Sequence, residues 1–159
     1  MIILGVDPGS LATGYGMVAY QNAALSPVCW GTISCSSSAS LQFRLKKIYD
    51  EISQIIRKHN PSEMIIESLF YAKNAQTALK LGHARGVILL AAMHADLGIA
   101  EYSPREVKQA LTGNGSASKQ QVKMMVMRLL GVTQDVWSFD ESDSLAIAIC
   151  HCHRVKFKR

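Results

Sequence analysis

The run from Ile2 to Gly9 constrains the fold most. Residues 2–6 are apolar apart from one glycine, and Asp7 follows them directly, ahead of a Pro-Gly pair. An apolar run of this length predicts a buried central strand that ends at a turn. Because a buried, unpaired carboxylate is costly, we expect Asp7 to lie at the exposed strand end or to be held by a cation. Asp before Pro-Gly is also ordinary turn chemistry, so this stretch alone leaves both interpretations open.

The rest of the chain predicts four more strands and five helices. Short connections predict that the first three strands form an antiparallel meander. The fourth strand again ends in a carboxylate, Glu67. Capping signals begin helices after Ser103 and Ser118, and Asp140 is expected to open the last one. The expected strands span residues 14–20, 25–34, 63–67 and 99–102, and the helices span 41–59, 74–97, 103–112, 118–131 and 140 into the basic tail.

Length and composition bound the class of protein. A chain of 159 residues with 48% hydrophobic content can bury one core, so a single domain over 1–159 is expected. No apolar run approaches the ~20 residues of a membrane span, which favours a soluble, cytoplasmic protein without a membrane partner. The four cysteines lie far from any regular disulfide framework and are expected to be reduced. The formal charge of +5 favours a polyanionic partner.

Four carboxylates lie at the ends of predicted elements. Asp7 and Glu67 end strands, whereas Asp140 and Asp143 share one face of the first turn of a helix. Strands and a helix that meet at one sheet edge bring such groups together, and divalent cations relieve their repulsion. Two cations ~4 Å apart can clamp the attacking water and the leaving oxygen of a phosphodiester, which is nuclease chemistry. Acids in a first helical turn also complement the helix dipole, so capping remains an alternative for Asp140 and Asp143.

Four stretches of the chain form a specific pattern. They are GVDPGSLATGYG at the start, IESLFYAKNAQTALKLGHARG at 66–86, REVKQALTGNGSASKQQVKMMV at 105–126 and DESDSLAIAICHCH at 140–153. In their order and spacing they closely resemble the RuvC family of Holliday-junction resolvases. The resemblance implies an α/β, RNase H-like nuclease domain. Its mixed five-stranded sheet would have three antiparallel N-terminal strands, then parallel strands, and be flanked by helices.

The resemblance also implies an activity and partners. It implies a homodimer that binds a four-way DNA junction and resolves it by paired symmetrical nicks, in homologous recombination and DNA repair. The hydrolysis would use two Mg²⁺ ions per active site, with Mn²⁺ as a substitute, alongside a branch-migration motor complex of the RuvA and RuvB type. Helix 74–97 corresponds to the family's dimer helix; from its apolar middle alone, burial within its own fold is an equal alternative.

Particular residues of this chain match functional positions of the family. Asp7, Glu67, Asp140 and Asp143 fall on the four catalytic, metal-binding carboxylates, although some members carry His at the Asp140 position. The DNA-contacting positions implied by the resemblance are Phe70, Tyr71, Lys73, Lys108 and Lys119. Phe70 matches an aromatic that projects towards the junction centre, and the two last lysines match basic positions near the scissile phosphate. Without the family, Phe70 reads equally as a buried loop anchor and the lysines as ordinary surface residues.

Other functions are weaker fits. Residues Cys150 to His153 contain metal-ligand types, but neighbours on a helix point in different directions, which argues against zinc. A related nuclease of ribosomal RNA precursors shares the Asp-Pro-Gly start and lacks the FYAKN and GHARG runs. Sugar-kinase and actin-like ATPases need two such domains, and a non-catalytic junction-binding module would not need four intact carboxylates.

Overall fold

The computed structural model describes residues 1–68 and 74–156, which form a mixed five-stranded sheet between helices. The strand order is β3-β2-β1-β4-β5, so the apolar N-terminal strand is central, as predicted. β1, β2 and β3 pair antiparallel, whereas β4 runs parallel to β1 and β5 parallel to β4. The strands are β1 (Ile2–Asp7), β2 (Ala12–Gln21), β3 (Ala24–Ser34), β4 (Glu63–Glu67) and β5 (Gly98–Tyr102).

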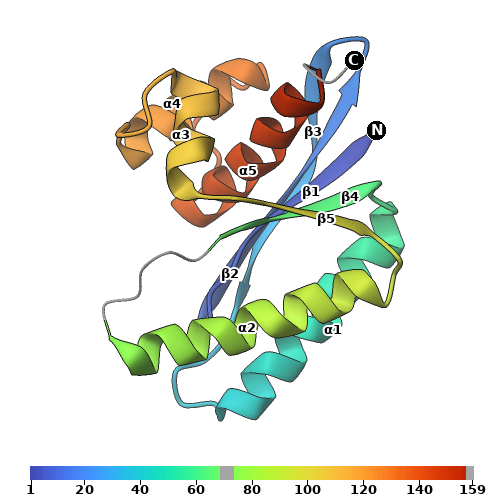
Figure 1. Cartoon of the computed structure of the whole chain (residues 1–159), viewed down its shortest axis with the longest axis vertical. Coiled ribbons are helices and arrows are strands. Elements are labelled where there is room, and N and C mark those ends of the chain that lie inside the picture. Colours follow the sequence, from blue (N-terminus) through green and yellow to red (C-terminus); the bar gives the residue numbers. More distant parts are fainter. Residues whose placement is uncertain (69–73, 157–159) are drawn as a thin grey trace.

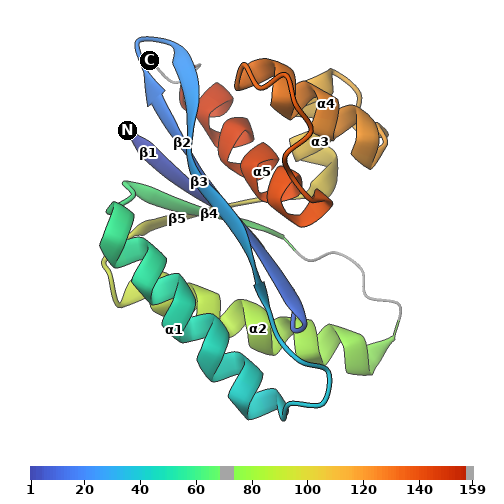
Figure 2. The ribbon, with the colours of Figure 1, turned by 180° about the vertical axis from the view of Figure 1, so that it is seen from behind.

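Within residues 1–68 and 74–156, five helices cover the two faces of the sheet. Helices α1 and α2 pack together on one face, and α3, α4 and α5 cover the other (Figure 1; the reverse side is shown in Figure 2). The helices are α1 (Leu41–His59), α2 (Ala75–Met93), α3 (Pro104–Thr112), α4 (Lys119–Leu129) and α5 (Phe139–Lys156). Within the part of the chain that the structure describes, no helix is both long and apolar enough to cross a membrane.

Three predicted helix limits are wrong. The helix expected over 118–131 ends at Leu129. The helix expected over 74–97 ends at Met93, because the amide of Leu97 bonds back to the carbonyl of Ala92 while Asp96 adopts a left-handed conformation. The last helix begins at Phe139 rather than Asp140. Its cap is Ser138, whose hydroxyl accepts from the amide of Glu141 while its own amide donates to the Glu141 carboxylate.

The alternation of side chains along the strands divides the core into two clusters. Ile3 of β1 and Ile65 of β4 face α3, α4 and α5, whereas Leu4 and Met64 face α1 and α2. Since successive side chains of a strand point to opposite faces, residues four positions after Ile3 and two after Ile65 share the α5 side. These positions are Asp7 and Glu67. The same pattern that builds the core therefore aims both carboxylates at α5.

Helix α5 lies unusually close to the sheet, because glycines line its path across β1 and β2. A Cβ atom at Gly5 would overlap the carbonyl oxygen of Ser144, and one at Gly14 would overlap the carbonyl oxygen of Asp140. Gly14 is also the residue paired with Asp7 in the β1–β2 ladder. The absent side chain at Gly14 therefore brings the start of α5 against the end of β1.

The two ends of the described chain lie away from this contact. Met1 precedes β1 and its ammonium donates to the carbonyl of Tyr20, at the end of the sheet opposite Asp7. Helix α5 runs from its start beside Gly14 towards the same distant end (Figure 1). The carboxyl end of β1 and the N-terminus of the chain thus occupy opposite edges of the molecule.

The contact between Gly5 and α5 yields a stability prediction. Gly5→Ala should lower the free energy of unfolding by about 1–3 kcal/mol, because the added methyl group forces the main chain of α5 away from β1. Chemical denaturation measures this change. Gly98→Ala is the control, since a Cβ there would meet its nearest neighbour, a side-chain carbon of Glu63, at an ordinary 3.4 Å. Equal effects of the two substitutions would contradict the proposed close contact.

Candidate active site

Asp7 and Glu67 are placed side by side by the parallel pairing of β1 and β4. The register joins Val6 to Ile66, so the two carboxylates follow at equivalent positions of neighbouring central strands. Both side chains leave the sheet on the face covered by α5. Of the four carboxylates that the sequence predicted to converge, these two lie side by side at the carboxyl end of the sheet.

Asp143 reaches the same edge from α5. It lies one turn into the helix, whose start is held by the Ser138–Glu141 capping box and by the close approach to Gly14. Glu141 therefore serves the helix cap, as the simpler interpretation of an acidic first turn predicts. Asp143 instead faces the ends of the strands.

The three acids line a hollow of about 270 Å³ between the sheet edge, α3, α4 and α5. We call this hollow the acidic pocket. Its wall combines these carboxylates with two lysines and with apolar side chains. The lining residues are Asp7, Glu67, Pro104, Val107, Lys108, Lys119, Val122, Asp143 and Ala146. Asp140 lies outside this lining, although its charge is close enough to raise the pKa of Asp7.

Burial and crowding raise the pKa of Asp7 and of Glu67. The pKa of Asp7 rises from 3.8 to about 7, chiefly because burial disfavours the charged form and then because Glu67 and Asp143 repel it. The pKa of Glu67 is raised by burial first and by Asp143 second, while Lys119 and Lys108 act in the opposite direction. The acidic pocket therefore carries negative charge that the described residues only partly neutralise.

Lys119 supplies part of that neutralisation. Its Nζ lies 2.6 Å from Oδ2 of Asp143, and the same hydrogen bond raises the pKa of the lysine. The Ser118–Gln121 capping box fixes the start of α4 and so places Lys119 at the rim of the pocket. Lys108 reaches the pocket from α3. The sequence predicted both lysines as candidates; the direct pair with Asp143, 24 residues away, has no local signature.

The donor set suits a hard cation, although it is not assembled around one. Among residues 1–68 and 74–156, no three His, Cys, Asp or Glu side chains meet closely enough to hold an ion as they stand. Carboxylate oxygens are nevertheless the ligands that Mg²⁺ and Mn²⁺ take, and the raised pKa of Asp7 marks a charge that a cation would stabilise.

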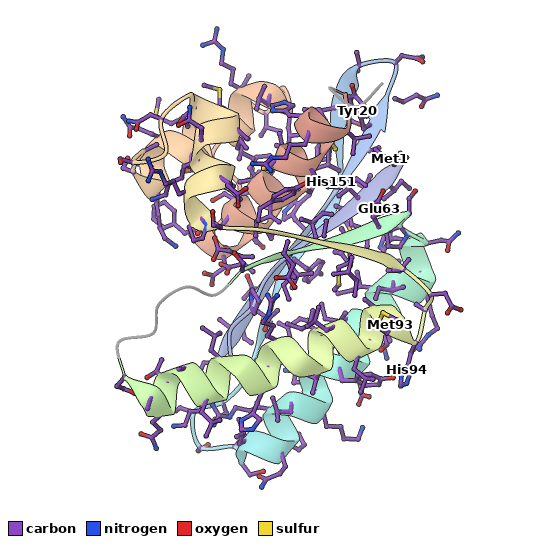
Figure 3. The ribbon with its side chains drawn as sticks, viewed as in Figure 1. Met1, Tyr20, Glu63, Met93, His94 and His151 are labelled. Carbon is purple, nitrogen blue, oxygen red and sulfur yellow. The ribbon has the colours of Figure 1, made fainter. Side chains whose placement is uncertain are left out.

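The cysteines and histidines near the end of α5 face different neighbours. Nδ1 of His151 lies 2.9 Å from the hydroxyl oxygen of Tyr102, and its Nε2 lies 3.2 Å from the carboxylate of Glu63. Figure 3 labels His151 and Glu63. His153 lies against the carbonyl of Ala110. All four cysteines of the chain are free thiols, as expected from the sequence. These contacts tie α5 to β4, β5 and α3.

The predicted DNA-contacting residues Phe70, Tyr71 and Lys73 lie outside the described residues. They follow Glu67 and Ser68 directly in the sequence and precede Asn74, the N-cap of α2. Their role in DNA contact therefore stays a prediction.

Comparison with known proteins identifies the family. The model of the family described as crossover junction endodeoxyribonuclease RuvC matches residues 3–151. RuvC of Pseudomonas putida is 50% identical over 152 residues, which cover 96% of this chain and 86% of that protein. RuvC of Chlorobium phaeobacteroides is 46% identical over 155 residues, 98% of this chain and 83% of the relative.

A solved structure supports the same assignment. The structure of Thermus thermophilus RuvC superposes with a TM-score of 0.91 at 28% identity, covering 99% of this chain and 97% of that one. A second structure holds T. thermophilus RuvC in complex with a Holliday junction substrate, again with a TM-score of 0.91, over 99% of this chain and 96% of that one. The expected RNase H-like fold is thereby confirmed, and the chain belongs to the RuvC family of crossover junction endodeoxyribonucleases.

Proposed function

We propose that this protein resolves four-way DNA junctions by paired symmetrical nicks in homologous recombination and repair. The observation that carries the proposal is the acidic pocket, where Asp7, Glu67 and Asp143 converge beside two lysines. Its relatives are crossover junction endodeoxyribonucleases, and its structural neighbour has been captured with a Holliday junction. Carboxylates flanked by cations fit phosphodiester hydrolysis, where charge develops on phosphate oxygens.

The pocket residues divide the chemistry between them. Asp7, Glu67 and Asp143, with Asp140 beside them, would hold two Mg²⁺ ions, for which Mn²⁺ would substitute. When bound, the pair of ions lowers the pKa of a water molecule and stabilises the charge of the phosphodiester under attack. Lys108 attracts the phosphate, and Lys119, freed from Asp143, does the same. Ionised Asp7 is the binding-competent form.

DNA contacts extend beyond the pocket. We infer that Phe70, Tyr71 and Lys73 touch the junction, because they follow Glu67 in the sequence and match DNA-contacting positions of the family. An aromatic ring that stacks on an unpaired base contributes ~1–3 kcal/mol to binding. The formal charge of +5 fits a polyanionic substrate.

We also infer a homodimer formed through α2. Leu79, Leu90 and Met93 are 62%, 47% and 59% exposed, which is unusual for large apolar side chains on one helix. Gly82 and Gly86 have open space where a side chain would be, so a second helix can approach closely. Two copies would supply the two sites that symmetrical nicks require. We place the dimer in the cytoplasm with a branch-migration motor of the RuvA and RuvB type.

Loss of one pocket carboxylate should abolish cleavage and spare binding. Asp7→Asn should lower the nicking rate on a synthetic four-way junction in Mg²⁺ by at least ~100-fold, because a ligand charge is removed from the pocket. Gel-based nicking and a binding assay in Ca²⁺ measure the two effects. Asp50→Asn, on the exposed face of α1, is the matched control. Undiminished cleavage by Asp7→Asn would refute the metal-site proposal, and preferential cutting of linear duplex or an RNA hairpin would refute the substrate.

The raised pKa of Asp7 predicts a pH-dependent cost to the metal-free fold. Between pH 3.8 and about pH 7, Asp7 keeps its proton in the folded protein and has lost it in the unfolded protein. The free energy of unfolding therefore falls as pH rises through this window. At pH 8 in chelator, Asp7→Asn should therefore be more stable than the parent protein by up to about 4 kcal/mol, and at pH 4 nearly equal to it. Urea denaturation at both pH values measures this. An identical pH dependence of the two proteins would contradict the shift.

The exposed face of α2 predicts the oligomeric state. Sedimentation velocity at micromolar concentration should show a dimer for the parent protein and a monomer for Leu90→Glu, because a buried, unpaired carboxylate is costly. Met124→Glu provides the control, since Met124 is 61% exposed on α4, away from the proposed interface. A monomeric parent protein, or dissociation by both substitutions alike, would argue against α2 as the interface.

A further inference from the structure

The main chain of Glu67 is held by an arginine from the opposite layer of the molecule. Nη1 of Arg85, on α2, donates to the carbonyl oxygen of Glu67 at 2.6 Å. Nη2 of the same guanidinium lies 2.5 Å from the carboxylate of Glu101 on β5. The amide of Ser68 donates to the carbonyl of Tyr102 at 2.9 Å and completes the end of this ladder. One guanidinium therefore joins the last residues of β4 and β5 to α2.

The chemistry of the contact favours a role in placement. A guanidinium is planar and presents its donors in a fixed fork, so two simultaneous bonds define both position and direction. The side chain of Arg85 is only 15% exposed, whereas that of Glu101 is 48% exposed. Exposed ion pairs contribute little to stability, while a charge-assisted bond to a carbonyl in a largely dry setting is stronger. The bond to Glu67 is thus the part of the contact that matters most.

Glu67 has particular need of such a tether. Asp7 is paired with Gly14 in the β1–β2 ladder, and Asp143 is one turn inside a capped helix. Glu67, the last residue of β4, pairs with Tyr102 of β5, which is the edge strand of the sheet, so the neighbour on that side has no further strand to hold it. Within the acidic pocket Asp143 repels the Glu67 carboxylate, while Lys119 and Lys108 attract it. A fixed main chain limits how far that repulsion can move the side chain.

We propose that Arg85 is a positioning residue that fixes the main chain of Glu67 and so keeps its carboxylate in the acidic pocket. The inference rests on the proposed nuclease function of that pocket. Because Arg85 lies on α2 and its guanidinium donates to the carbonyl of Glu67, it links the proposed dimer helix to the strand end that carries a pocket carboxylate. Pairing of two subunits through α2 would thereby help to fix the Glu67 carboxylate in each active site.

Substitutions at Arg85 and Glu101 separate the two halves of the contact. Arg85→Met removes both bonds, Arg85→Lys keeps a cation that cannot form the fork, and Glu101→Gln removes only the ion-pair partner. Arg85→Met should lower kcat for junction nicking by about 10- to 100-fold, with KM within about twofold, because a misplaced group costs rate rather than binding. Arg85→Lys should lose about three- to tenfold in kcat, and Glu101→Gln no more than about twofold.

Two measurements identify positioning as the cause. Hydrogen exchange of the Ser68 amide, followed by NMR, should accelerate at least about tenfold in Arg85→Met, because the ladder end opens locally. Sedimentation should still show the dimer. Should Arg85→Met not fold, Arg85→Lys takes its place in both measurements.

The outcomes are distinct. Parental kcat together with parental Ser68 exchange in either Arg85 variant overturns the inference. A rise in KM, or dissociation of the dimer, as large as the fall in kcat overturns it as well. An effect of Glu101→Gln as large as that of Arg85→Met overturns it too, because the bond to Glu67 would then not be the important one. A parent protein that cuts no junction overturns the proposed function itself.

Discussion

The close contact between α5 and the two central strands is the constraint on which the rest of the structure depends. Gly5 and Gly14 carry no side chain where the main chain of α5 passes, so the helix lies almost on the sheet. A helix on a sheet normally stands off by the thickness of interlocking side chains, which would separate its acids from those of the strands. Here the same contact that packs the core also brings Asp143 into one hollow with Asp7 and Glu67.

That convergence has an electrostatic cost. Three carboxylates share a partly buried hollow, and the pKa of Asp7 rises to about 7 because its charge is poorly solvated and repelled. Lys119 offsets part of this repulsion through Asp143. Functional sites commonly hold such uncompensated charge, because a group that is fully satisfied within the protein has little to offer a ligand. A cation of the kind proposed for the acidic pocket would relieve this repulsion.

Local patterns in the sequence predicted most of the fold and part of the site. Apolar runs and capping residues predicted the five strands and five helices of the described residues, and the acids at strand ends identified Asp7 and Glu67. Helix ends were less predictable, since the end of α2 at Met93 depends on the backbone bond from Leu97 to Ala92, which forms beyond the last helical residue. The pair between Lys119 and Asp143 and the hold of Arg85 on Glu67 join residues 24 and 18 positions apart in different elements. Such contacts follow from how whole layers pack, and no periodicity within one element encodes them.

The placement of the chain's ends has a practical meaning. Met1 is separated from Asp7 by the length of β1, about 20 Å, and α5 leads away from the acidic pocket over its whole length. A fluorophore or surface linker attached at Met1 would therefore lie at the end of β1 opposite the acidic pocket. Because β1 runs from Met1 towards the acidic pocket, a protein tethered at Met1 presents the pocket to the solution, which suits single-molecule observation.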